Sequence, residues 1–125
     1  MSTTATVARV ADVPDPRARL RRIFHMVIEE SGPVELDTAL WAARSEPLVS
    51  SAIDAASAER IDLLSGLYQE LGFPERQARR WALSAYSAFA GLLSTGDAAR
   101  RVLGTAAERR AYAEHVISLF VPGKS

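Results

Sequence analysis

The sequence predicts an all-α protein with a single helical-bundle domain of five main helices. Apolar residues recur at steps of three and four over long stretches, as they do on one face of an amphipathic helix. No segment shows sustained alternation of apolar and polar residues between hairpin turns, which is the pattern typical of β-strands. The 125 residues, of which 48% are hydrophobic and 24% charged, are enough for one core that buries about two-thirds of the unfolded chain's surface.

The helical domain is expected to span residues 15–121. The small and polar residues 1–14 are expected to form a flexible N-terminal lead-in, and residues 122–125 a short tail. The five helices are predicted over 15–31, 34–44, 47–71, 74–94 and 105–120, with a short helical turn over 98–103.

Capping residues support several of these boundaries. Asp15 precedes Pro16, and an Asp that caps free N–H groups, followed by Pro in the first turn, is a common helix start. Gly72 is expected to take the left-handed backbone conformation that ends the third helix. Thr105 and Glu108 have the spacing of a capping box at the start of the last helix.

The composition excludes several classes of function. The chain has no cysteine, which excludes disulfides, thiolate zinc sites and thiol catalysis. Its 15 basic and 15 acidic residues balance, so there is no bulk electrostatic attraction to phosphate or anionic lipid. No stretch is long and apolar enough for a membrane span, and the first 15 residues lack the apolar core of a secretory signal. We therefore expect a soluble cytoplasmic protein.

The sequence contains one arrangement of residues that could support catalysis. His25 and Glu29 are four residues apart on one predicted helix, where they could form a two-ligand metal half-site. A small helical enzyme that uses His25 with Glu29 or Glu30 is an alternative function. The simpler interpretation is a polar residue near an acid by chance, so we expect no enzymatic activity, no cofactor and no metal.

Several large side chains lie on helices that are expected to pack together. Such side chains can line a ligand cavity between helices, and a plain hydrophobic core is the alternative interpretation. The residues are Phe24, Met26, Trp41, Tyr68 and Trp81.

The last two main helices have more apolar surface than packing against the three other helices requires. Small residues such as Ala85, Ala88 and Gly91 allow a second helix to approach closely, and Phe89 and Phe120 supply bulk. A self-complementary patch across a two-fold axis would bury this surface, so we expect a homodimer.

The order of these elements resembles the C-terminal effector-binding and dimerisation domain of TetR-family transcriptional regulators. The resemblance covers residues 15 to 121 and rests on an ordered set of segments rather than on one diagnostic motif. The segments are DPRARLRRIF (15–24), ELDTALWAARSEPLVSSAI (35–53), ERIDLLSGLYQELGFPERQARRWALSAYSAFAGLL (59–93) and TAAERRAYAEHVISLF (105–120).

The resemblance implies that different helices form the dimer interface and the effector pocket. Residues 74–94 and 105–120 of two subunits would form a dimeric four-helix bundle, and the three earlier helices would enclose an effector pocket. The implied interface residues are Trp81, Ala85, Tyr86, Phe89, Leu92, Tyr112, Val116 and Phe120. The implied pocket residues are Phe24, Met26, Trp41, Leu64 and Tyr68.

The chain departs from the family pattern at its beginning. Family members have an N-terminal helix-turn-helix domain that enters the major groove, whereas about 14 residues without that motif precede the first predicted helix here. We therefore expect a regulatory domain that senses a small, mostly apolar effector and does not itself bind DNA. Such a domain could also form a heterodimer with a full-length TetR-type regulator. A ligand-free helical adaptor is the remaining alternative.

Overall fold

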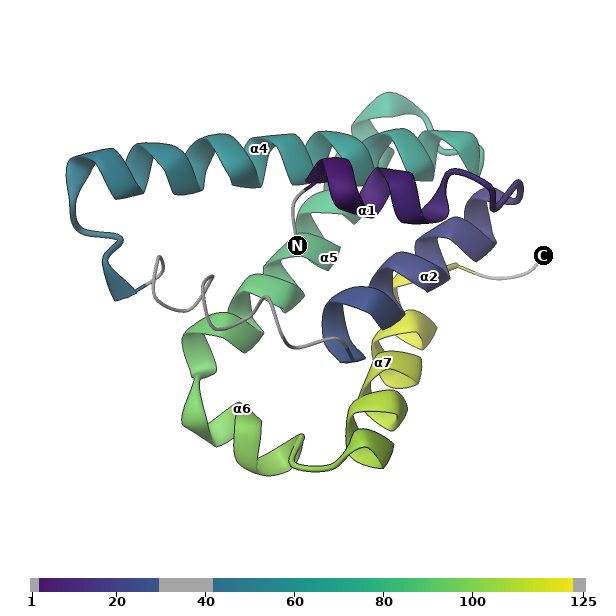
Figure 1. Cartoon of the computed structure of the whole chain (residues 1–125). Helices are drawn as coiled ribbons and strands as arrows, with labels where there is room; N and C mark the ends of the chain where they lie inside the picture. Colours follow the sequence, from purple (N-terminus) through teal and green to yellow (C-terminus); the bar gives the residue numbers. More distant parts are fainter. Residues whose placement is uncertain (1–2, 30–41, 123–125) are drawn as a thin grey trace.

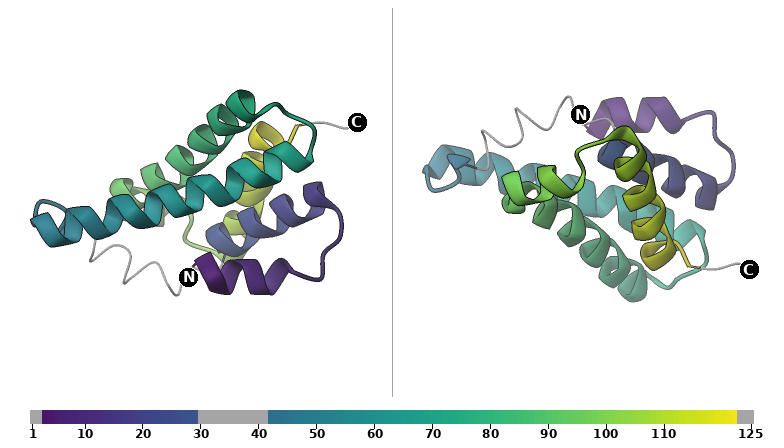
Figure 2. Two further views of the ribbon diagram at one scale, coloured as in Figure 1. Left: turned by 90° about the horizontal axis from the view of Figure 1, so that it is seen from above. Right: turned by 90° about the horizontal axis from the view of Figure 1, so that it is seen from below.

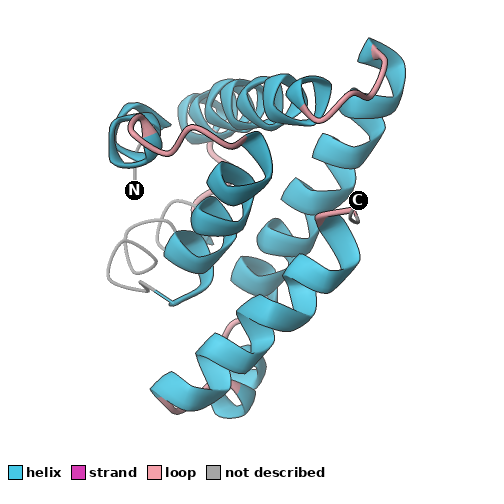
Figure 3. Cartoon of the chain, turned by 90° about the vertical axis from the view of Figure 1, so that its right-hand side faces the viewer, coloured by secondary structure: helices cyan, strands magenta, loops and turns pink. Residues whose placement is uncertain are grey.

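The computed structural model describes residues 3–29 and 42–122, which consist of helices joined by short turns and loops (Figures 1 and 3). These residues form six α-helices and no strand, which confirms the predicted all-α class. The helices are α1 (Thr3–Val10), α2 (Pro16–Glu29), α4 (Pro47–Glu70), α5 (Glu75–Thr95), α6 (Asp97–Val102) and α7 (Ala106–Phe120).

Local interactions set the helix boundaries that the sequence predicted. The Asp15 carboxylate accepts a hydrogen bond from the Ala18 N–H at 3.0 Å, and the Thr105 hydroxyl accepts one from the Glu108 N–H at 3.1 Å. Gly72 has a φ of 110° after the end of α4, a region that glycine enters without steric cost. The predicted helix over 34–44 falls almost entirely outside the described residues.

The N-terminal segment differs from the predicted lead-in over 1–14, because residues Thr3–Val10 form helix α1. Val10 and Thr6 are buried, and α1 contacts both α2 and α4. This burial stabilises a short helix that would be marginal by itself in water. The helix depends on residues distant in sequence, which a local pattern of small and polar residues does not reveal.

The four long helices form two packed pairs. Helix α4 packs on α5, to which a short turn joins it, and α2 packs on α7 from the other end of the chain. Figure 2 shows α4 crossing the other helices, with its first turns extending beyond them. Most side chains in those first turns are exposed, whereas Leu64, Leu67 and Tyr68 near its end are buried.

Tyr68 ties the two pairs together. Its side chain is fully buried, it stacks on Trp81 of α5 with ring centroids 5.6 Å apart, and its hydroxyl donates a hydrogen bond to the carbonyl oxygen of Phe120. That carbonyl is in the last turn of α7, where carbonyls lack partners within the helix. Burial raises the pKa of Tyr68, so it remains a neutral donor.

All four long helices contribute buried hydrophobic residues to the core, and α2 contributes the most. Its buried hydrophobic residues are Leu20, Ile23, Phe24, Met26 and Ile28 from α2, Leu64, Leu67 and Tyr68 from α4, Ala78, Ala82 and Ala85 from α5, Ala113, Val116 and Ile117 from α7, and Val10 from α1. None of the described helices has both the length and the apolarity needed to cross a membrane.

Candidate functional site

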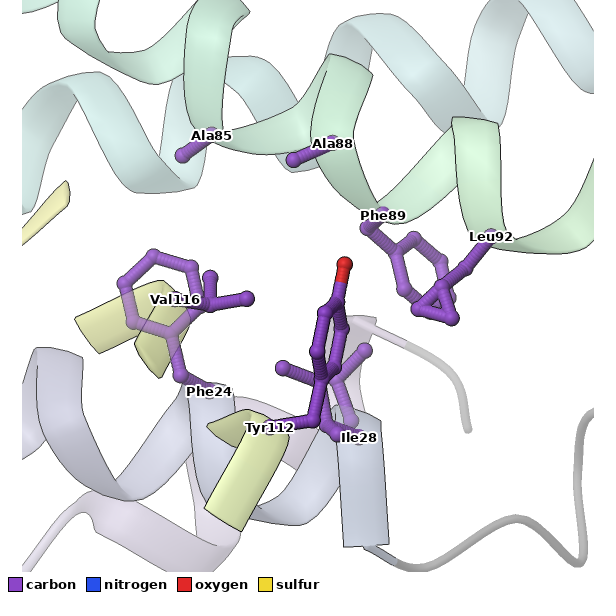
Figure 4. A pocket seen from close by; sticks show the side chains of 9 residues that line it. Phe24, Ile28, Ala85, Ala88, Phe89, Leu92, Tyr112 and Val116 are labelled. Carbon is purple, nitrogen blue, oxygen red and sulfur yellow. The ribbon is translucent and has the colours of Figure 1, made fainter. Parts of the chain in front are cut away.

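An apolar pocket lies where α2, α5 and α7 meet (Figure 4). It has about 260 Å³ of empty space, part of which is open to solvent. The lining residues are Phe24, Val27, Ile28, Ala85, Ala88, Phe89, Leu92, Tyr112 and Val116.

Helical periodicity explains why these residues converge. Successive lining residues of each helix are one, three or four positions apart, and each residue has another of its set three or four positions away, so each set lies on one face of its helix. On α5, Ala85 and Ala88 lie next to the bulkier Phe89 and Leu92. Because a methyl group fills little volume, the two alanines leave space in front of α5, which Figure 4 shows between them and the side chains of α2 and α7.

The lining is hydrocarbon apart from one group, the hydroxyl of Tyr112. In Figure 4 the Tyr112 ring projects from α7, with its hydroxyl oxygen toward Ala88 and Phe89 of α5. None of the lining residues carries a charge. A pocket with an apolar wall and a single polar group favours an uncharged, mostly apolar guest, since an ion would lose its hydration there without compensation.

The predicted effector-pocket residues are divided between this pocket and the core. Phe24 lines the pocket. Met26, Leu64 and Tyr68 are buried in the core, with 2%, 8% and 0% of their surface exposed, and they do not contribute to the lining. Trp41 lies outside the described residues.

Most of the predicted interface residues lie along the same pocket. Those that line it are Ala85, Phe89, Leu92, Tyr112 and Val116. The other three, Trp81, Tyr86 and Phe120, are partly buried and pack against the core of their own chain. The Tyr86 hydroxyl pairs with the Ser57 hydroxyl at 2.9 Å.

Sequence reasoning did not single out Val27 and Ile28 as pocket residues, although both belong to the apolar face of α2. It noted Ala88 only as a small residue that permits close helix contact. The spacing of apolar residues identifies the face of a helix, but it does not identify the helix that this face meets.

A second cluster, the histidine bridge, joins α2 to α7 and consists of His25, Glu29 and Glu114. The Nδ1 atom of His25 contacts a Glu29 carboxylate oxygen one turn along α2. Its Nε2 atom lies 2.6 Å from a carboxylate oxygen of Glu114 on α7. The Arg21 guanidinium lies 3.4 Å from both Glu114 oxygens. The hydrogen bond with His25 lowers the pKa of Glu114, and the charges of Arg21 and His25 act in the same direction.

The geometry of the bridge suits a structural link between helices. Ionised carboxylates only accept hydrogen bonds, so an imidazolium that donates from both nitrogens satisfies both contacts. Each ring nitrogen already has a carboxylate partner, and the described part of the chain contains no group of three or more side chains suited to holding a metal ion. Glu30, the other acid considered for His25, lies outside the described residues.

Neither a family model, nor a curated protein, nor a solved structure matches this chain.

Proposed function

We propose that this chain is a ligand-binding and dimerisation domain similar to the C-terminal domains of TetR-family transcriptional regulators, and that it senses a small, mostly apolar effector. The observation that supports ligand binding most strongly is the apolar pocket between α2, α5 and α7. Pockets between packed helices are common sites for small ligands.

The size of the pocket favours a small effector. Pockets for drug-sized ligands have volumes of roughly 300–1,000 Å³, and even the 260 Å³ of empty space here includes the part open to solvent.

The outward faces of α5 and α7 support the proposed homodimer. Leu83 on α5 and Leu119 on α7 each expose 55% of their surface. The small exposed residues Ser87 on α5 and Ala111 on α7 lie four positions after Leu83 and eight before Leu119. They belong to the same helix faces and would let a second pair of helices approach closely. A full-length TetR-type regulator would be a second partner for these faces.

Filling the pocket tests the proposal directly. Toluene should bind the wild-type chain, and Ala88→Leu should lower its affinity at least tenfold, because the larger side chain occupies the space in front of α5. Titration calorimetry or ligand-observed NMR measures both affinities, and circular dichroism checks that the variant is folded.

Ala55→Leu is the matched control, because Ala55 is an exposed alanine on α4. This change should leave toluene binding unaltered. The proposal fails if wild-type protein does not bind toluene up to its solubility limit, or if folded Ala88→Leu binds it as well as the wild type does.

A further inference from the structure

The histidine bridge places one imidazole ring between two carboxylates. Both ring nitrogens of His25 face carboxylate oxygens, one from Glu29 on α2 and one from Glu114 on α7. A neutral imidazole has one N–H donor and one acceptor nitrogen, whereas the imidazolium has two donors. The neutral ring therefore satisfies one of the two contacts and turns a lone pair toward an ionised oxygen at the other. Histidine ordinarily changes its charge between pH 5 and 8, so this difference falls within a range that cells experience.

The charge balance of the cluster changes with the same proton. The Arg21 guanidinium lies 3.4 Å from both Glu114 oxygens, so the protonated cluster has two cations and two carboxylates. Loss of the His25 proton leaves two carboxylates with one guanidinium, and Glu29 then has no cation in contact among the described residues. The side chains of His25 and Glu29 are 25% and 29% exposed, so solvent screens these charges less than it screens a fully exposed pair.

The other charges near α2 do not replace this proton. Helix α1 contributes one charged side chain, the cation Arg9, and on α4 the carboxylate of Glu70 pairs with Arg19 of α2 at 3.0 Å. The hydrogen bonds and ion pairs of His25 within the described residues go to the two carboxylates of the bridge. The remaining described side chains that carry charge near neutral pH within one turn of His25 or Glu114 are exposed, and they are Arg22 on α2 and Arg110 and His115 on α7.

We propose that the histidine bridge is a proton-dependent link, which holds α7 on α2 while His25 is charged and weakens when the ring becomes neutral. Helix α7 packs mainly on α2 and less on α5 (Figure 1), so α7 is the element that responds. Ala113, Val116 and Ile117 bury apolar surface in either state, so the chain stays folded and α7 is attached more loosely at mildly alkaline pH. The inference concerns the fold itself and holds whether or not a ligand occupies the pocket.

Thermal unfolding of four chains at pH 6 and pH 8.5 tests the link. The wild type should melt about 3 °C or more above His25→Ala at pH 6, and the difference should fall to less than half at pH 8.5. In Glu114→Gln the amide donates as well as accepts hydrogen bonds, so it can pair with a neutral ring. The melting temperature of this variant should therefore fall less between the two pH values than that of the wild type. His115→Ala, which removes an exposed histidine of α7, should behave as the wild type does.

Amide hydrogen exchange gives a second readout that needs only the wild-type chain. After correction for the intrinsic exchange rate, the amides of α7 should lose at least threefold more protection between pH 6 and pH 8.5 than the amides of α4 and α5, because local opening sets their exchange. An equal change in all three helices would overturn the proposal. So would a difference in melting temperature between wild type and His25→Ala that is the same at both pH values, or a fall for Glu114→Gln as large as that of the wild type.

Discussion

At the scale of single residues, His25 links two of the helices that line the pocket. It faces Glu29 on its own helix and Glu114 on α7. Its neighbours in the sequence, Phe24 and Met26, are buried. His25 thus adds a polar link between α2 and α7, which also pack through buried apolar side chains.

Removing this side chain should destabilise the protein in a pH-dependent way. The folded chain lowers the pKa of Glu114 from its ordinary value of 4.5. The ionised carboxylate therefore contributes stability above that pH, and the contribution is lost as the pH falls through the lowered pKa. His25→Ala should reduce the free energy of unfolding by about 1 kcal/mol at pH 6, and the difference from the wild type should shrink as the pH falls from 4.5 to 2.5.

Urea unfolding at pH 6 and pH 2.5 measures the effect. His115→Ala is the matched control, because His115 is an exposed histidine on α7 and the change should alter stability by less than about 0.5 kcal/mol. An equal loss for His25→Ala at both pH values would contradict the assigned role of Glu114.

At the scale of helices, the features that the sequence predicted are those set by interactions between neighbouring residues. Asp15, Gly72 and Thr105 act on backbone groups within a few residues, so their roles follow from the neighbouring sequence. Helix α1 is different, because burial of Val10 depends on α2 and α4. The local spacing of apolar residues does not predict a contact between segments that are distant in the sequence.

The candidate site, too, was predictable only in part. The apolar faces of α2, α5 and α7 were predictable from spacing, but the arrangement of those faces was not. Phe89 and Tyr112 were predicted to face a second subunit, and in this chain they line a pocket with Phe24. Leu83, on the same helix as Phe89, is a large apolar residue that α5 exposes to solvent. Only packing distinguishes these two residues.

The exposed face of α5 is expected to contribute to the homodimer interface. Leu83→Arg should raise the dissociation constant of the homodimer at least tenfold, because a partly buried arginine at the interface would lack a counter-ion. It should not disturb the core, since Leu83 is 55% exposed in the single chain. Sedimentation equilibrium at micromolar concentration measures the change.

Leu48→Arg is a suitable control, because Leu48 is an exposed leucine in the first turn of α4, with 87% of its surface accessible. This variant should dimerise as the wild type does. A wild-type chain that stays monomeric would refute the dimer, and equal effects of the two variants would refute the assignment of its interface.

At the scale of the whole molecule, the pocket exists because both ends of the described chain meet. Helix α2 comes early in the sequence and α7 late, the two pack together, and α5 closes the third side. A ligand that binds only the folded chain stabilises it, and the stabilisation grows with the logarithm of the ratio of ligand concentration to dissociation constant. An effector in this position would therefore strengthen the packing of three helices at once.

The proposed ligand site requires that the space between α2, α5 and α7 be accessible to an apolar guest. A crystal of the wild-type chain pressurised with xenon tests this directly, because xenon enters apolar cavities without needing a polar partner. We expect xenon density bounded by Phe24, Phe89 and Tyr112. Density confined to other parts of the molecule, or a site closed by its own side chains, would contradict it.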